Sequence, residues 1–313
     1  MSTLFRLALC AALGSAAFIA QADTKAFETP RLPRTDGGPI HWYLDRPAGS
    51  AKVGLLVIAQ GSGCQSVTQS ENLAAIRLAF PEFATLMVEK HGVTTKDRPE
   101  DDHMDCSASF REHHTVSQRL SDYRQVIEGL RGAEWWDGQL ALIGGSEGGL
   151  AMAMLAPQVQ AQAVILLSTG GGLPFGEIVR QSIPEPGRPQ ADAAFEKARK
   201  HPASSELWAG SSLRFWADII DRRVADDLLR SSADILLIQG GKDVSGSTKA
   251  ARAASDLFVV AGRCNLTYWE LAGLDHGLVD ANGNSRMHET LSLASLWLRT
   301  KSASAERAQC MKP

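Results

Sequence analysis

Short segments that are apolar at every position recur along the chain, with helical stretches between them. A strand without polar positions is covered on both faces, which is typical of a parallel sheet between two layers of helices. One intervening stretch, residues 115–130, places Val116, Leu120 and Tyr123 on a single helical face. The alternation predicts an α/β fold with a mostly parallel central sheet and helical crossovers. The expected strands are Val53–Ala59, Thr85–Val88, Leu140–Ile143, Ala163–Leu167, Ile235–Ile238 and Leu266–Leu271.

The segment from about Gly172 to Arg230 departs from this alternation. It begins with Gly- and Pro-rich sequence and continues as charged helical sequence that contains Trp208, Phe215 and Trp216. Because it is too long for a single crossover, we expect a helical cap inserted over the sheet. The three aromatic residues then form either the core of the cap or the apolar wall of a substrate pocket.

The first twenty-two residues have the layout of a secretory signal peptide. Arg6 precedes an apolar run from Leu7 to Ala20, and Ala20-Gln21-Ala22 is a small-x-small cleavage site. A retained membrane anchor is the alternative, but the run is shorter than the roughly 20 apolar residues that a span requires. We expect residues 23–313 to be an exported, soluble α/β domain, periplasmic or extracellular, without a stable membrane anchor.

Export changes the reading of the cysteines. Removal of Cys10 with the signal leaves an even number, which suits an oxidising compartment. Four cysteines allow three pairings. We favour Cys64 with Cys106 and Cys264 with Cys310, because each bond would tie a flexible segment near a strand end; buried free thiols are the alternative.

The charge balance bears on the partners. The chain has 32 Lys and Arg against 35 Asp and Glu, a net charge of −3, and no basic run. A nucleic-acid-binding surface needs clustered cations to neutralise phosphates. We therefore expect no nucleic acid and a small-molecule ester or a short peptide as the substrate.

A candidate nucleophile lies in the segment LALIGGSEGGL, residues 140–150. Gly144-x-Ser146-x-Gly148 matches the strand–turn–helix nucleophile elbow, in which the serine occupies a sharp turn that leaves no room for bulky neighbours. An apolar strand precedes the motif and a helix of small residues follows it. The alternative is an ordinary Gly-rich turn.

The serine needs a base and an acid, which in this arrangement follow in the order Ser, Asp or Glu, His. Asp243 follows the expected strand 235–238, and His276 follows the strand 266–271. Asp275 is the rival acid, but its side chain should point elsewhere on an extended loop. We expect surface or packing roles for the other histidines, namely His41, His91, His103, His113, His114, His201 and His288.

An acyl-transfer reaction also needs donors for a tetrahedral oxyanion. The backbone N–H of Glu147, directly after the nucleophile, would supply one. The Gly-rich loop after the strand 53–59 should supply the other, and we favour the N–H of Ser62, with Gly63 as the alternate. A plain tight turn is the alternative interpretation of this loop.

With these motifs in order, the sequence resembles the α/β-hydrolase superfamily from about His41 to Leu298. The elbow GGSEGG is similar to that of the dienelactone hydrolase and prolyl-oligopeptidase-like branch, whereas Gln60-Gly61-Ser62 differs from the His-Gly-Gly of lipases and esterases. The resemblance implies an α/β-hydrolase fold, a sheet flanked by helices, and a serine hydrolase mechanism.

Other site chemistries are poorer fits. The loop 101–106, with His113 and His114 nearby, lacks the fixed ligand spacing of a zinc site, and the Gly clusters lack the partners of a nucleotide site. We expect no metal and no cofactor. The sequence thus predicts a carboxylesterase-like serine hydrolase that works through an acyl-enzyme. The alternatives are a peptidase or amidase on short peptides, a non-catalytic binding protein and, least favoured, a metal-dependent phosphoesterase.

Overall fold

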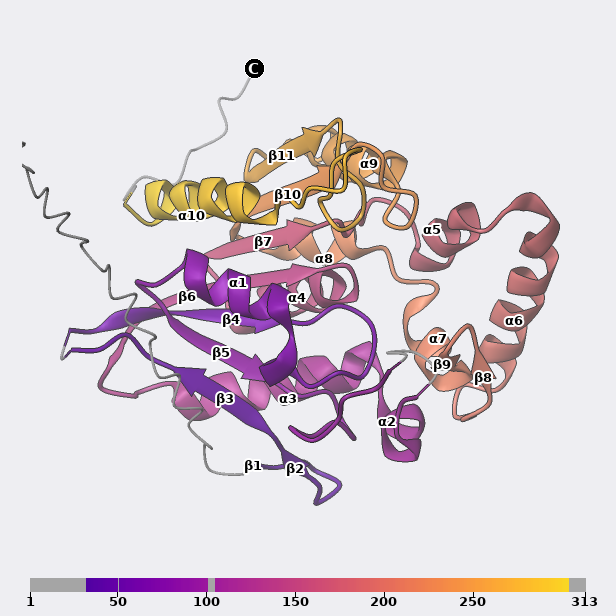
Figure 1. Cartoon of the computed structure of the whole chain (residues 1–313), viewed down its shortest axis with the longest axis horizontal. Coiled ribbons are helices and arrows are strands. Elements are labelled where there is room, and N and C mark those ends of the chain that lie inside the picture. The colour runs from indigo at the N-terminus through magenta and orange to yellow at the C-terminus, as the bar shows by residue number, and fades with distance from the viewer. Residues whose placement is uncertain (1–31, 50, 101–104, 304–313) are drawn as a thin grey trace, which may run out of the picture.

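The computed structural model describes residues 32–49, 51–100 and 105–303. Within these ranges seven strands form one sheet in the spatial order β11-β10-β7-β6-β4-β5-β3, and all neighbours are parallel except β3 and β5 (Figure 1). The predicted fold class, a mostly parallel sheet flanked by helices, is therefore confirmed. The strands are β3 (Trp42–Asp45), β4 (Val53–Ala59), β5 (Ala84–Val88), β6 (Trp136–Gly145), β7 (Ala163–Leu167), β10 (Asp234–Gly240) and β11 (Leu266–Leu271).

Each predicted strand coincides with a strand of the structure, and the agreement of the ends differs from strand to strand. β4, β7 and β11 have the expected bounds, whereas β6 begins four residues earlier than expected, at Trp136. Its early residues Asp137, Gly138 and Gln139 are exposed, so the pattern of burial on both faces does not extend to them. Burial on both faces begins at Leu140, where the prediction also began.

Two layers of helices cover the sheet because side chains alternate along each strand. In β4, Leu55 and Val57 enter one core and Leu56 and Ile58 enter the other. The first core holds residues of α3 (Val116–Leu130), α4 (Glu147–Val159), α8 (Val224–Arg230) and α9 (Thr248–Val260). The second holds residues of α1 (Glu71–Ala79) and α10 (Met287–Ala303).

The segment between β7 and β10 contains helices that lie beyond the carboxyl ends of the strands, at the right of Figure 1. These are α5 (Phe175–Ser182), α6 (Arg188–Lys200) and α7 (Leu213–Ile219), with the hairpin β8 (Leu207–Trp208) and β9 (Ser211–Ser212). The segment 172–230, expected as a cap, also contains α8, whose buried face packs on α4. Helix α8 thus belongs to the layer against the sheet.

The smaller elements are peripheral. They are β1 (Leu32–Pro33), β2 (Pro39–Ile40), α2 (Ala108–His113) and the short 3-10 helices η1 (Val67–Gln69) and η2 (Glu185–Gly187). The expected signal peptide, residues 1–22, lies outside the described residues. In the part of the chain that is described, none of the helices combines the length and apolar character that crossing a bilayer requires.

The Cys64–Cys106 disulfide, one of the two favoured pairings, is present, with the two Cα atoms 5.6 Å apart. It joins the loop after β4 to the segment before α2. Cys310, the expected partner of Cys264, lies outside the described residues, so the second pairing stays a prediction.

Candidate active site

Ser146 occupies the turn between β6 and α4 in a backbone conformation that L-residues rarely adopt, with φ 52° and ψ −124°. Its N–H donates to the carbonyl of Leu167 at the end of β7, 2.9 Å away, which fixes the turn to the neighbouring strand. Positive φ at a non-glycine residue costs free energy and persists where the surroundings enforce it. The side chain is thereby held at the carboxyl edge of the sheet.

The glycines around Ser146 are required by close backbone contacts. A Cβ atom at Gly148 would lie 2.4 Å from the carbonyl oxygen of Ala59, and one at Gly144 would lie 2.4 Å from the carbonyl carbon of Gly148. Both distances are far below van der Waals contact. The start of α4 can therefore approach β4 and β6 only without side chains at these positions, which is the geometry expected of a nucleophile elbow.

His276 and Asp243 form a hydrogen-bonded pair across two loops. Asp243 follows β10 and His276 follows β11, and their Oδ2 and Nδ1 atoms are 2.8 Å apart. The Asp243 carboxylate also accepts hydrogen bonds from the N–H groups of Ser245 and Gly246 and from Nε2 of Gln239. Burial raises the pKa of Asp243, but the bonds from His276 and the backbone outweigh it and hold the pKa below its usual value. Asp243 is thus a fixed, ionised partner for the ring.

The rival acid, Asp275, has a different set of contacts. Its Oδ1 accepts hydrogen bonds from the N–H groups of Gly277 and Val279, both at 2.9 Å. The side chain therefore caps its own loop, while Asp243 contacts the imidazole.

Ser146 and His276 line one cavity of about 250 Å³ at the carboxyl edge of the sheet. Ser62, Gln60 and Ser168 line it as well. Two larger hollows, of about 910 and 700 Å³, surround Trp135 near the opposite ends of β4 and β6 and are remote from Ser146. Of these three cavities, the smallest contains both the candidate nucleophile and a candidate base in its described lining, and we take it as the site.

The loop after β4 lies directly against the nucleophile. A Cβ atom at Gly61 would be 3.8 Å from Cβ of Ser146 and 3.5 Å from the carbonyl oxygen of Gly145. Glu147 is the first residue of α4, and the first amides of a helix have no acceptor within the helix. The two elements that should supply oxyanion donors, Ser62 and Glu147, therefore meet at Ser146.

The Glu147 side chain lies in a buried charged cluster. Its Oε1 is 2.7 Å from Nη1 of Arg119, 3.2 Å from Nε2 of His114 and 3.5 Å from Nζ of Lys90. Burial raises the pKa of Glu147. The opposing effect of Lys90, the His114 ring and Arg119 is larger, and it holds the pKa far below its usual range. Burial lowers the pKa of His114 to about 4, so this ring is neutral at pH 7.

This cluster was not predicted, although the sequence contains one signal for it. Arg119 is three residues after Val116 and four before Tyr123, a spacing that places it on the apolar face of α3. A cation on such a face needs a buried partner. The sequence does not indicate which carboxylate that partner is, and His114 was expected to have only a surface or packing role.

The three aromatic residues of the cap pack against one another. The ring centroids of Trp208 and Trp216 are 4.8 Å apart, those of Phe215 and Trp216 are 5.5 Å apart, and Phe195 of α6 joins them. None of the three is among the described residues that line the cavity at Ser146. They pack as one aromatic cluster in the segment between β7 and β10, apart from the described lining of this cavity.

The loop 101–106, weighed above as a zinc site, is described only in part. Residues 101–104 lie outside the described residues, and Cys106 is in the disulfide with Cys64. Among the described residues, no group of His, Cys, Asp and Glu is arranged to hold a metal ion.

Comparison with known proteins identifies the fold. No protein-family model and no curated protein matches the sequence. Among solved structures, Est1E from Butyrivibrio proteoclasticus is 18% identical, with a TM-score of 0.62 over 87% of this chain and 98% of its own. The monoacylglycerol lipase from Paleococcus ferrophilus is 17% identical, with a TM-score of 0.57 over 84% and 99%.

A puromycin-hydrolyzing peptidase from Mycobacterium tuberculosis is 16% identical, with a TM-score of 0.62 over 90% of this chain but only 40% of the peptidase. The similar structures are α/β hydrolases. The chain therefore has the α/β-hydrolase fold. At these identities the likeness concerns the fold, and the chemistry has to be argued from the site itself.

Proposed function

We propose that the protein is a serine hydrolase that cleaves an ester-type bond through an acyl-enzyme. The observation that carries the proposal is the His276–Asp243 hydrogen bond in a site where His276 and Ser146 line the same cavity. A strained elbow that exposes a serine, beside a histidine oriented by a buried carboxylate, is the arrangement that activates a hydroxyl for attack on a carbonyl.

The steps follow from these positions. Oγ of Ser146 attacks the carbonyl carbon while Nε2 of His276 takes its proton, and Asp243 stabilises the imidazolium that forms. The N–H groups of Glu147 and Ser62 bind the oxyanion. His276 then gives the proton to the leaving alcohol, and a water activated by the same ring releases the acid from Ser146.

The lining of the cavity favours an uncharged substrate. The described residues that line it include no Asp or Glu, whereas a peptidase that anchors a substrate amine needs a carboxylate. This observation favours an ester over the alternative, a short peptide. The volume of about 250 Å³ is suited to a small acyl group.

Two buried polar atoms beside the nucleophile suggest the character of the substrate. Oε1 of Gln60 and Oγ of Ser168 are buried without a hydrogen-bond partner. Gln60 follows Ala59, which pairs with Gly144, and Ser168 follows Leu167, which pairs with Gly145, so the two residues flank Ser146 on the neighbouring strand ends. Buried polar atoms are normally satisfied, so a side-chain rotation that turns either atom into the cavity would let it bind a hydroxyl or amide group of a substrate near the scissile carbonyl.

We also propose export, with cleavage after Ala22. The Cys64–Cys106 disulfide supports it, because such bonds persist in oxidising compartments. Mass spectrometry of the intact protein from the producing cells would check this proposal. We expect a mature chain that begins at Asp23, and a chain that begins at any other residue would contradict this cleavage site.

The decisive experiment is covalent labelling with a fluorophosphonate probe, with Ser146→Ala as the control. We expect rapid labelling of the wild-type protein and none of the variant, together with hydrolysis of short-chain p-nitrophenyl esters. Absence of both labelling and hydrolysis in well-folded wild-type protein would overturn the proposal and favour a non-catalytic binding protein. Peptide amides cleaved faster than esters would favour the peptidase.

A further inference from the structure

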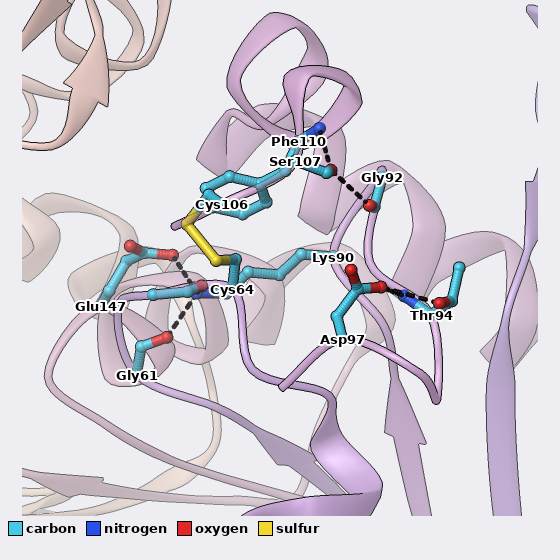
Figure 2. Close-up of a disulfide and its surroundings, with 11 residues drawn as sticks. Gly61, Cys64, Lys90, Gly92, Thr94, Asp97, Cys106, Ser107, Phe110 and Glu147 are labelled. Carbon is cyan, nitrogen blue, oxygen red and sulfur yellow. Dashed lines mark hydrogen bonds and ion pairs between the residues drawn. A yellow bond between two sulfur atoms is a disulfide. The ribbon is translucent and has the colours of Figure 1, made fainter. Parts of the chain in front are cut away.

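The loop that faces the nucleophile is held from behind by two buried cations. Nζ of Lys90 donates to the carbonyls of Gly61 and Gly63, each at 2.6 Å, and Nη2 of Arg119 donates to the carbonyl of Gln60 at 2.8 Å. Three carbonyls of the four-residue loop 60–63 are thus directed at cations. Figure 2 shows Lys90 between the Gly61 carbonyl and the Glu147 carboxylate.

These bonds determine where the amides of the loop point. In a trans peptide unit the N–H is directed opposite to the C=O, and no described peptide bond is cis. The unit that contains the Gly61 carbonyl also contains the N–H of Ser62. With the carbonyl fixed on Lys90, this N–H is directed away from the cluster. Ser62 lines the cavity together with Ser146, on the side of the loop opposite the cations.

Glu147 connects the cations to the nucleophile. It directly follows Ser146, and its carboxylate contacts both Lys90 and Arg119. The same residue therefore supplies one oxyanion donor through its N–H and positions the loop that supplies the other. With His114 neutral, the cluster contains two positive charges and one negative charge, so its net charge also favours an oxyanion nearby.

The cost of the cluster argues for a role beyond stability. The side chains of Lys90, Arg119 and Glu147 are 0%, 2% and 7% exposed. Burial of ions costs several kcal/mol each, and apolar residues of similar volume often stabilise a fold as well or better. The far end of the loop is fixed separately by the Cys64–Cys106 disulfide (Figure 2).

We propose that Lys90, Arg119 and the Glu147 carboxylate are positioning residues for the oxyanion hole: they fix the carbonyls of the loop 60–63 so that the N–H of Ser62 faces the oxyanion. This inference rests on the proposed function. The residues would not touch the substrate. They would act through the backbone that does.

The test uses Lys90→Met, which keeps an unbranched stem in the same channel and removes the charge. We expect kcat for a p-nitrophenyl ester to fall about 100-fold while KM changes little, because a displaced donor weakens the transition state rather than the bound ester. A trifluoromethyl ketone provides a second readout. Ser146 adds to its carbonyl carbon, His276 takes the proton, and the former carbonyl oxygen becomes an oxyanion. Its affinity should fall by the same factor as kcat/KM.

Arg34→Met is the matched control. It breaks another buried ion pair, in which Arg34 contacts Asp122 on the same helix as Arg119, with side chains 5% and 2% exposed. We expect its Tm to fall as in Lys90→Met and its kcat and inhibitor affinity to stay at the wild-type level. Arg119→Lys is the second test variant, since it keeps the charge but loses the fork that reaches Glu147 and Gln60 together; we expect kcat to fall about 10-fold.

The outcomes separate the two proposals. Wild-type protein that neither hydrolyses esters nor reacts with a fluorophosphonate would overturn the serine hydrolase itself. An active wild type with unchanged kcat and inhibitor affinity in Lys90→Met, or equal losses of kcat in Lys90→Met and Arg34→Met, would overturn only the positioning role. If Lys90→Met does not fold, unchanged kcat in Arg119→Lys has the same meaning.

Discussion

His276 Nδ1 lies 2.8 Å from Oδ2 of Asp243, although 33 residues separate the two in the chain. The second carboxylate oxygen of Asp243 accepts bonds from two backbone N–H groups, so it is not available to the ring. The imidazole is thus oriented through a single carboxylate oxygen, and its Nε2 is left for the cavity that it shares with Ser146.

This relationship predicts different effects for substitutions of Asp243 and Asp275. In Asp243→Asn, the amide can donate to Nδ1 and so select the tautomer that carries its proton on Nε2, which cannot accept the proton of Ser146. We expect kcat to fall about 10⁴-fold with the fold intact. Asp275→Asn keeps an oxygen for the N–H groups of Gly277 and Val279 and should retain most activity. Steady-state kinetics on an ester checks both, and the reverse order of effects would make Asp275 the acid.

The close contacts at the elbow predict that the two glycines on either side of Ser146-Glu147 respond differently to alanine. In Gly148→Ala the new Cβ would lie 2.4 Å from the Ala59 carbonyl oxygen, so we expect a loss of about 3 kcal/mol or more in unfolding free energy. In Gly145→Ala the nearest atoms, both of Leu167, are at 3.7 Å, which is ordinary contact. Denaturant unfolding of the two variants should separate them clearly. Equal stability would mean that the turn relaxes freely.

The disulfide predicts a large contribution to stability from loop closure. Cys64 and Cys106 are 42 residues apart, and a crosslink over such a loop lowers the entropy of the unfolded chain by an amount worth about 4 kcal/mol. Cys64→Ser/Cys106→Ser should unfold at lower denaturant concentration than the wild type. Cys264→Ser is the companion variant for the second expected bond, and non-reducing peptide mapping would find Cys264 joined to Cys310 or refute that pairing.

The neutral His114 predicts a stability that falls in mild acid. Its pKa is about 4 in the fold against 6.5 for the free side chain, so between these values the unfolded chain binds a proton that the folded chain does not. The contribution is complete above pH 6.5 and is lost as the pH falls toward 4, on the order of 3 kcal/mol in all. His114→Gln, which keeps a donor for Glu147, should show a flatter decrease of Tm from pH 7 to 5. His91 has a similar pKa and is present in the wild type and in His114→Gln, so its own effect on stability is the same in the two. Identical slopes of Tm against pH in the two proteins would therefore count against a contribution from His114.

The unpartnered hydroxyl of Ser168 predicts a preference for hydroxylated acyl groups. One hydrogen bond in a buried site is worth about 1 kcal/mol, so p-nitrophenyl 3-hydroxybutyrate should be cleaved about 5-fold more efficiently than the butyrate. Ser168→Gly removes the hydroxyl and accommodates the φ of 50° at this position. The variant should lose the preference and keep its kcat/KM for the butyrate. A wild type without any preference would indicate that the site holds water instead.

Much of the fold could be predicted from the sequence because burial on both faces appears in consecutive residues. Val53–Ala59 and Ala163–Leu167 are apolar throughout, and both are strands with the expected bounds. The start of β6 escaped the same reasoning because Asp137 and Gln139 are exposed. The motif around Ser146 was recognisable for a related reason, since the glycines and the serine of the turn are adjacent in the chain.

The sequence by itself determined the layered α/β fold, the elbow at Ser146 and the loops that hold Asp243 and His276, because each depends on residues close together in the chain. Only the tertiary structure decided which charges meet behind the loop 60–63. Lys90 lies just after β5, Arg119 in α3 and Glu147 in α4, and each is separated from the next by 28 or 29 residues. A periodic pattern records which side of a helix or strand is buried. Which buried charge another one contacts depends on how these elements pack, and that is fixed only when the whole core forms.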